Sequence, residues 1–229
     1  MKYQRFIYAL AFVLLFAYGC SEDSSNTTTN TKPSTQAEEQ QASVNEDYQN
    51  AVALYESNNL DEAMNIFGEL LKSNPKDGQN DFYIGNIYRK KNDIDSAIRF
   101  YQSAIQKTPT LVAAYNNLAA LQMAKESFDE ALQTADKGLA VDSNFTDLKF
   151  KKGQILFVKQ QYKESNTMLT ETAKDPAFYE SYRFIGLNYL QLSDKAHALE
   201  NFRTYLKLAP EGNPFKEQIK QTVTELENK

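Results

Sequence analysis

The stretch DFYIGNIYRKKNDIDSAIRFYQSAIQKTP, residues 81–109, decides the fold of this chain. Residues 81–88 place large apolar side chains three to four positions apart, and residues 94–106 do the same, so each part predicts a helix with one apolar face. Residues 91–93 form the turn between them, and Pro109 ends the second helix. The stretch is therefore predicted to be a pair of helices joined by a short turn.

The same pattern recurs five times between residues 44 and 210. A column of small residues on the first helices advances in steps of 34, 34, 34 and 33, and a second small column keeps the same steps. A fixed period of this length indicates stacked units that cannot bury their apolar faces alone, so the sequence predicts an all-α solenoid with a long concave surface. The first column is Ala51, Gly85, Ala119, Gly153 and Gly186, and the second is Ala63, Ala97, Ala131, Ser165 and Ala198.

Two columns of larger residues are expected to fill the hollows beside the small ones. The third unit departs from this pattern, with Gln122 and Ala135 where bulk is usual, and the fourth unit lacks one residue between Leu169 and Pro176. These departures leave the curvature of the two units open. The larger columns are Leu54, Tyr88, Gln122, Leu156 and Tyr189, then Phe67, Tyr101, Ala135, Leu169 and Phe202.

The spacing resembles the tetratricopeptide repeat (TPR), in which a small residue and an aromatic on the first helix precede an alanine and an aromatic on the second, followed by proline. The resemblance covers residues 44–210 and implies a right-handed α-solenoid of five helix pairs. Residues 211–229 contain a further apolar helical pattern, which predicts a helix that caps the last repeat. One closely matching unit carries Ile84, Gly85, Tyr88, Ala97, Tyr101, Ala104 and Pro109.

Residues 1–19 are predicted to be an export signal, because two basic residues precede an almost wholly apolar run. That run, residues 6–18, is shorter than the ~20 residues that a membrane-spanning helix needs. Cys20, the only cysteine, lies where cleavage would make it the first residue. This placement resembles the lipobox of bacterial lipoproteins and implies a lipid anchor on Cys20, of the kind that incorporates palmitate. The alternative is ordinary secretion, which would leave Cys20 as a free thiol.

Residues 20–43 are rich in Ser, Thr, Asn, Gln and Glu and have almost no large apolar side chain. Such a composition cannot repay the entropy of ordering, so this segment is predicted to be a disordered tether. In many lipoproteins a serine after the cysteine, here Ser21, accompanies sorting to the outer membrane. The expected location is the bacterial cell envelope, at the periplasmic face of the outer membrane or at the cell surface.

Composition argues against several classes of function. The net charge of −5 disfavours nucleic acid as a partner. One cysteine and one histidine exclude an internal disulfide and the usual metal sites, and no cofactor is expected. His197 has no obvious catalytic partner nearby in the sequence and is expected to be structural. We therefore do not expect an enzyme.

In TPR proteins the first helix of each pair lines the concave groove, so the resemblance implies a set of groove residues outside the packing columns. Aromatic members could pack the side chains of a bound segment, and amide members could hydrogen-bond its backbone. The groove residues implied are Tyr48, Tyr55, Phe82, Asn86, Arg89, Asn116, Asn117, Met123, Phe150, Lys151, Gln154, Phe157, Arg183, Leu187 and Leu190.

Three of these residues, Asn86, Asn117 and Lys151, match places used by the carboxylate clamp of chaperone-binding TPR domains. Phe82 and Asp147, however, occupy places where those domains have basic residues. This difference argues against capture of a C-terminal carboxylate, because amide contacts alone do not select a negative charge.

Taken together, the sequence predicts a membrane-tethered scaffold or adaptor of the bacterial envelope that binds a segment of another envelope protein. Attachment to the membrane would raise its local concentration. Analogy with other envelope lipoproteins suggests the assembly of an envelope complex as the process. The alternative is binding of peptidoglycan or another polysaccharide through the aromatic residues of the groove.

Overall fold

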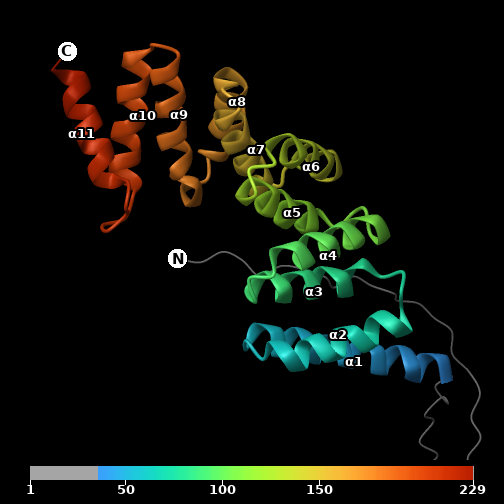
Figure 1. Cartoon of the computed structure of the whole chain (residues 1–229). Coiled ribbons are helices and arrows are strands. Elements are labelled where there is room, and N and C mark those ends of the chain that lie inside the picture. The colour runs from blue at the N-terminus through green and yellow to red at the C-terminus, as the bar shows by residue number, and fades with distance from the viewer. Residues whose placement is uncertain (1–35, 229) are drawn as a thin grey trace, which may run out of the picture.

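The computed structural model describes residues 36–228, with side chains from residue 43 onward. Within this range the chain forms eleven α-helices and one short 3-10 helix, and it has no strand. The helices lie side by side in a curved array that runs from α1 to α11 (Figure 1). The expected export signal and Cys20 lie outside the described residues.

Ten of these helices form five consecutive pairs, and α11 covers the last one. Within each pair the two helices contact each other extensively, and each second helix also contacts the first helix of the next pair. The predicted all-α solenoid of helix pairs is confirmed. The pairs are α1 (Gln36–Glu56) with α2 (Leu60–Ser73), α3 (Gly78–Lys90) with α4 (Ile94–Lys107), α5 (Val112–Ala124) with α6 (Phe128–Val141), α7 (Thr146–Val158) with α8 (Tyr162–Thr172), and α9 (Glu180–Gln191) with α10 (Lys195–Leu208), followed by α11 (Lys216–Glu227).

The array differs from the sequence-based boundaries in three places. Helix α1 begins at Gln36, so the predicted end of the tether at residue 43 is wrong. Gln, Ala and Glu, which dominate residues 36–43, favour a helix when one can continue into a packed segment. The missing residue of the fourth unit shortens α8, and a 3-10 helix at Pro176–Phe178 leads into α9. The last helix begins only at Lys216.

Small residues on the first helices permit a close crossing with the second helices. A Cβ atom added to Gly153 would come within 2.7 Å of the Leu169 side chain, and one added to Gly186 within 2.5 Å of the Phe202 ring. Leu169 and Phe202 are both fully buried, so neither side chain has free space to move into. The small column therefore exists because the large column of the same pair fills the space beside it.

Each turn between paired helices contains one residue in the left-handed region. These residues have φ between 59° and 66°, and none of them is glycine. The conformation lets the following backbone N–H return to the first helix, as in the 2.9 Å bond from Asp93 N to Tyr88 O. The five residues are Asn58, Asn92, Glu126, Gln160 and Ser193, which again follow the repeat.

Ion pairs also connect neighbouring repeats. In three places a lysine of one turn pairs with an aspartate in the first turn of the preceding second helix. Most of these side chains are well exposed, so each pair contributes roughly 0–1 kcal/mol. The acidic residues also favour the helix starts at which they lie. The pairs are Lys91 with Asp61, Lys125 with Asp95, and Lys159 with Asp129.

The close crossing predicts that Gly186→Ala destabilises the protein by about 2 kcal/mol, because the added methyl group overpacks the buried Phe202 ring. The matched control is Gly68→Ala in α2, where an added Cβ meets nothing within 4 Å. Removing that helical glycine should raise stability by about 0.5–1 kcal/mol. Urea unfolding followed by circular dichroism measures both changes, and equal midpoints for the two variants would contradict the packing argument.

The turn geometry predicts that Glu126→Gly stabilises the protein by about 0.5–1 kcal/mol. The left-handed conformation costs an L-residue about 1–2 kcal/mol, and the greater freedom of glycine in the unfolded chain offsets only part of this gain. Ala124→Gly, at the end of helix α5, is the control and should lower stability. Thermal unfolding distinguishes the two, and a lower melting temperature for Glu126→Gly would show that the turn is not strained.

Candidate functional site

The first helices of the pairs line the inner face of the array. Helix α5 contacts α7, and α7 contacts α9, whereas no two second helices within residues 36–228 make a comparable contact. A stack bends toward the elements that touch one another, so the first helices lie inside and the second helices outside. All fifteen predicted groove residues belong to α1, α3, α5, α7 and α9. The inner face is therefore the place to look for a site.

A group of five residues, here named the polar centre, consists of Asn86, Arg89, Asn117 and Lys151 on first helices and the fully buried Tyr101 of α4. The Oδ1 atom of Asn86 accepts hydrogen bonds from the Tyr101 hydroxyl at 2.7 Å and from Asn117 Nδ2 at 2.9 Å. The charge of Arg89 lowers the pKa of both Tyr101 and Lys151. Hydrogen bonds within the polar centre thus join helices α3, α4 and α5, and the charge of Arg89 also acts on Lys151 of α7.

The polar centre carries positive charge with little compensation. Burial lowers the pKa of the Lys151 ammonium; Asp147 opposes this shift, and Arg89 adds to it. Within the described part of the chain, neither Arg89 nor Lys151 forms an ion pair. Burial also raises the pKa of Tyr101, so that its hydroxyl stays protonated. Two cations beside amide groups favour a ligand that carries a negative charge.

Two further amides extend the polar centre along the inner face. Asn116 is half-buried; its Nδ2 donates to Asn117 Oδ1 at 3.3 Å, and its own Oδ1 is buried without a partner. Gln154 is half-buried on α7, one turn after Lys151. Both amides can serve the backbone of a bound segment, which offers N–H donors and C=O acceptors.

The aromatic groove residues mostly fill space between repeats. Tyr48, Tyr55 and Phe82 all pack edge-on against Tyr83, with ring centroids 5.5–5.9 Å apart. Phe150 and Phe157 similarly flank Phe184, at 6.1 Å and 5.5 Å. All five are half-buried, so the groove presents parts of these rings rather than open stacking faces.

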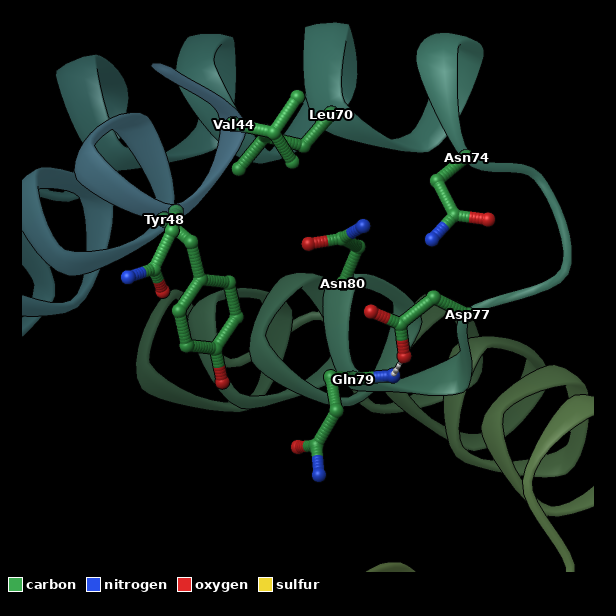
Figure 2. A pocket seen from close by; sticks show the side chains of 8 residues that line it. Val44, Tyr48, Leu70, Asn74, Asp77, Gln79 and Asn80 are labelled. Carbon is green, nitrogen blue, oxygen red and sulfur yellow. Dashed lines mark hydrogen bonds between the residues drawn. The ribbon is translucent and has the colours of Figure 1, made fainter. Parts of the chain in front are cut away.

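Tyr48 also lines a separate cavity of about 290 Å³ between α1, α2 and α3 (Figure 2). Asn80 points into this cavity, and its Oδ1 is buried without a hydrogen-bond partner. Burial raises the pKa of the Tyr48 hydroxyl. The cavity lies at the N-terminal end of the array, and none of its lining residues belongs to the polar centre.

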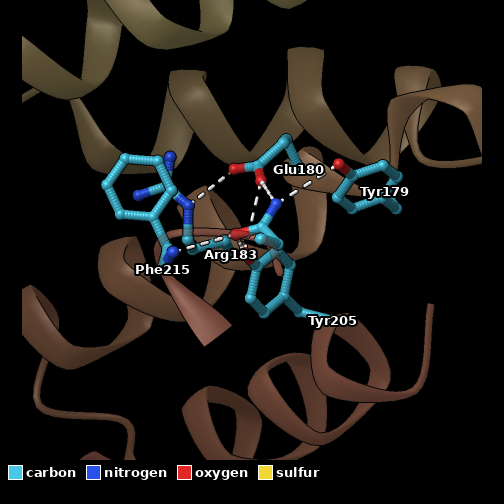
Figure 3. A network of polar contacts seen from close by, with 6 residues as sticks. Tyr179, Glu180, Arg183, Tyr205 and Phe215 are labelled. Carbon is cyan, nitrogen blue, oxygen red and sulfur yellow. Dashed lines mark hydrogen bonds and ion pairs between the residues drawn. The ribbon is translucent and has the colours of Figure 1, made fainter. Parts of the chain in front are cut away.

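Arg183, which the resemblance placed in the groove, instead ties the cap to the last repeat. Its Nε donates to Glu180 Oε2 at 2.6 Å, and its guanidinium lies 4.1 Å from the centre of the Phe215 ring (Figure 3). Asn213 completes the network by accepting from Tyr205 and donating to Glu180. Burial, together with Glu180, raises the pKa of Tyr205 to about 12. These contacts hold the segment that leads into α11.

The remaining predicted groove residues are apolar and pack against the core. Met123 adjoins the cluster around Tyr115, and Leu187 and Leu190 adjoin the cluster around Phe202.

Sequence reasoning missed the part that Tyr101 plays in the polar centre, because its column position indicated packing only. It also did not single out Arg89 as a cation whose charge acts on Lys151.

His197 is exposed and belongs to a helix start. Its Nδ1 lies 2.6 Å from Asp194 Oδ2, and its ring stacks on Tyr189.

Among the residues that the structure describes, no three His, Cys, Asp or Glu side chains are grouped so as to hold a metal ion. No helix in residues 36–228 is both long and apolar enough to cross a bilayer.

Comparison with known proteins supports the repeat assignment. The TPR repeat family matches residues 85–126. The Hsp70-Hsp90 organizing protein 3 of Arabidopsis thaliana is 32% identical over 93 residues, which cover 40% of this chain and 17% of that protein. The stress-induced-phosphoprotein 1 of Caenorhabditis elegans matches over 27% of its length, so the chain spans only a small part of these curated relatives.

Solved structures show the same fold at low sequence identity. PilW, described as a widely conserved type IV pilus biogenesis factor, superposes with a TM-score of 0.67 and 16% identity over 85% of this chain and 88% of that one. YrrB, described as a TPR protein with an unusual peptide-binding site, gives 0.66 and 17% over 78% and 90%. The repeat match and the shared fold agree: residues 85–126 match the TPR repeat family, and the described array has a TPR-like helical repeat fold.

Proposed function

We propose that this chain is a scaffold of the bacterial envelope that binds a segment of another envelope protein on the inner face of α3, α5 and α7. The observation that carries the proposal is the polar centre, where neither Arg89 nor Lys151 forms an ion pair within the described residues, and the charge of Asp147 only partly offsets the burial of Lys151. A scaffold holds its partner by contacts that are already in place, which reduces the entropic cost of binding.

The polar centre also indicates the chemistry of the bound segment. An acidic side chain or a carboxylate would neutralise Arg89 and Lys151 and would accept from Asn117. The sequence alone argued against such a group, because Phe82 and Asp147 carry no positive charge. Arg89 supplies a second cation from one turn beyond Asn86, so an acidic group would meet two positive charges, with the Asp147 carboxylate opposing them. Asn116 and Gln154 would then hydrogen-bond the backbone on either side of the acid.

The envelope location rests on the N-terminal sequence and on analogy. Cys20 follows an export signal, and acylation there would hold the solenoid at the outer membrane. PilW, which has the same fold, is described as a pilus biogenesis factor. By that analogy the partner would belong to an envelope complex whose assembly the scaffold assists.

Glycan binding remains the alternative, and no feature of the structure favours it. Sugar recognition by stacking needs an aromatic face that is open to the ligand, whereas Tyr48, Tyr55, Phe82, Phe150 and Phe157 pack against other rings. We propose a binding role without catalysis.

The proposal predicts that the double variant Arg89→Gln/Lys151→Gln loses its partner. The protein would be used as bait on detergent-solubilised envelopes, with crosslinking, and the captured segment then titrated against each variant. We expect affinity to fall at least tenfold, because two charge-assisted contacts are removed. The control is Lys195→Gln/Lys207→Gln, which removes equal charge from the exposed face of α10. Equal loss in both double variants would mean that net charge, not the polar centre, governs binding.

Lipid anchoring is tested separately. Cells that produce the wild-type protein should incorporate radiolabelled palmitate into it, and the Cys20→Ala variant should take up none, because no other residue offers a thiol. Fractionation should move the variant from the membrane to the soluble fraction. Palmitate labelling that is equal in the two proteins would rule out acylation at Cys20.

A further inference from the structure

The third repeat lacks two aromatic rings that the second repeat has. In the second repeat, Tyr88 on α3 stacks on Phe100 of α4, with ring centroids 5.3 Å apart and planes at 19°. Thirty-four residues later, the equivalent places are taken by Gln122 on α5 and Thr134 on α6. Both are more than nine-tenths buried, at 6% and 8% exposure. The third repeat therefore has short polar side chains where the second has a ring stack.

A cavity of about 400 Å³ lies at this position, between α4, α5 and α6, and is here named the outer cavity. Ile105, Tyr115 and Leu118 supply its apolar wall, and Gln122 and Thr134 are the buried polar residues within it. Its rim consists of exposed polar residues on the two second helices, namely Gln102, Glu130, Gln133 and Lys137. The cavity can therefore be reached from solvent at the outer face of the array.

Gln122 lines this space and carries an acceptor that has no partner. Its Oε1 is buried and receives no hydrogen bond, although a buried polar atom normally has a partner. The other third-column residues, Leu54, Leu156 and the two tyrosines, bring either no polar atom or a ring that fills the space. A ligand that completes the outer cavity must supply an apolar body and one hydrogen-bond donor.

We propose that the outer cavity binds a tyrosine side chain of a partner protein. The ring would lie against Ile105 and Leu118, and the Gln122 amide would turn its buried Oε1 toward the cavity to accept from the hydroxyl. The stack of Tyr88 and Phe100 shows that this helix geometry accommodates an aromatic ring at the equivalent position. The unpaired acceptor selects tyrosine over phenylalanine, because only the phenol has a donor at the ring edge.

The site is distinct from the polar centre. Helices α4 and α6 are second helices and lie on the outside of the array, whereas Arg89 and Lys151 lie on the inside. A segment held at the polar centre would leave the outer cavity open. The inference therefore does not depend on the proposed function, and it gives the scaffold a second docking point.

The first test titrates two small probes into the full-length protein and follows the NMR signals of residues in the folded array. N-acetyl-tyrosinamide should cause saturable shifts in the amide NMR signals of Gln122, Thr134 and Tyr115. N-acetyl-phenylalaninamide differs only by the hydroxyl and should bind at least fivefold more weakly. Absence of saturable shifts, or equal affinity for the two probes, would overturn the proposal.

Two variants locate the binding. Gln122→Tyr/Thr134→Phe copies the second repeat, so we expect it to fill the outer cavity, raise the melting temperature and abolish binding of the tyrosine probe. Gln122→Leu keeps the volume but removes the acceptor, so the preference for the tyrosine probe over the phenylalanine probe should disappear. This single variant decides the question if the double variant does not fold.

The control variant is Gln191→Leu, which makes the same chemical change at an exposed position at the end of α9. It should bind both probes as the wild type does. The proposal fails if Gln122→Leu retains the fivefold preference for the tyrosine probe, or if a folded Gln122→Tyr/Thr134→Phe still binds that probe.

Discussion

The close crossing of two helices within each pair is the contact on which the rest of the molecule depends. At Gly186 the backbone of the first helix approaches the Phe202 ring so closely that a methyl group would clash. Because this crossing recurs with the period of the sequence, successive pairs adopt similar geometry and stack into one curved array. The inner face follows from that stacking, since the first helices of the later pairs contact one another. A change at one crossing would therefore alter the alignment of its neighbours as well.

The polar centre shows how such an array acquires specificity. Asn86 is buried, and both of its neighbours donate to it, so its amide positions Tyr101 and Asn117. Arg89 and Lys151 come from different repeats, and their mutual repulsion is tolerated because other contacts fix the helices on which they lie. A bound acid would remove that repulsion. In the proposed complex, binding energy would come from charges that are already in place in the folded array.

Repeat positions that look equivalent in sequence can have different consequences in space. Tyr88 and Phe100 fill their hollow, whereas Gln122 and Thr134 leave one open. Several aromatic residues implied to be ligands, such as Phe150 and Phe157, pack between repeats instead. Arg183 was placed in the groove but holds the cap through Glu180 and Phe215. Spacing identifies the helix face on which a side chain lies, but the partner it meets depends on the neighbouring repeat.

The sequence by itself determined the helix pairs, their period, the small columns and the presence of a cap, because helical periodicity and the exclusion of Cβ atoms act over short distances along the chain. Only the tertiary structure decided that Asn117 and Tyr101 both donate to Asn86 and that Gln122 lacks a partner. These relations join residues of different helices, and in some cases of different repeats. Their distances depend on how the repeats stack and curve, which no local pattern specifies.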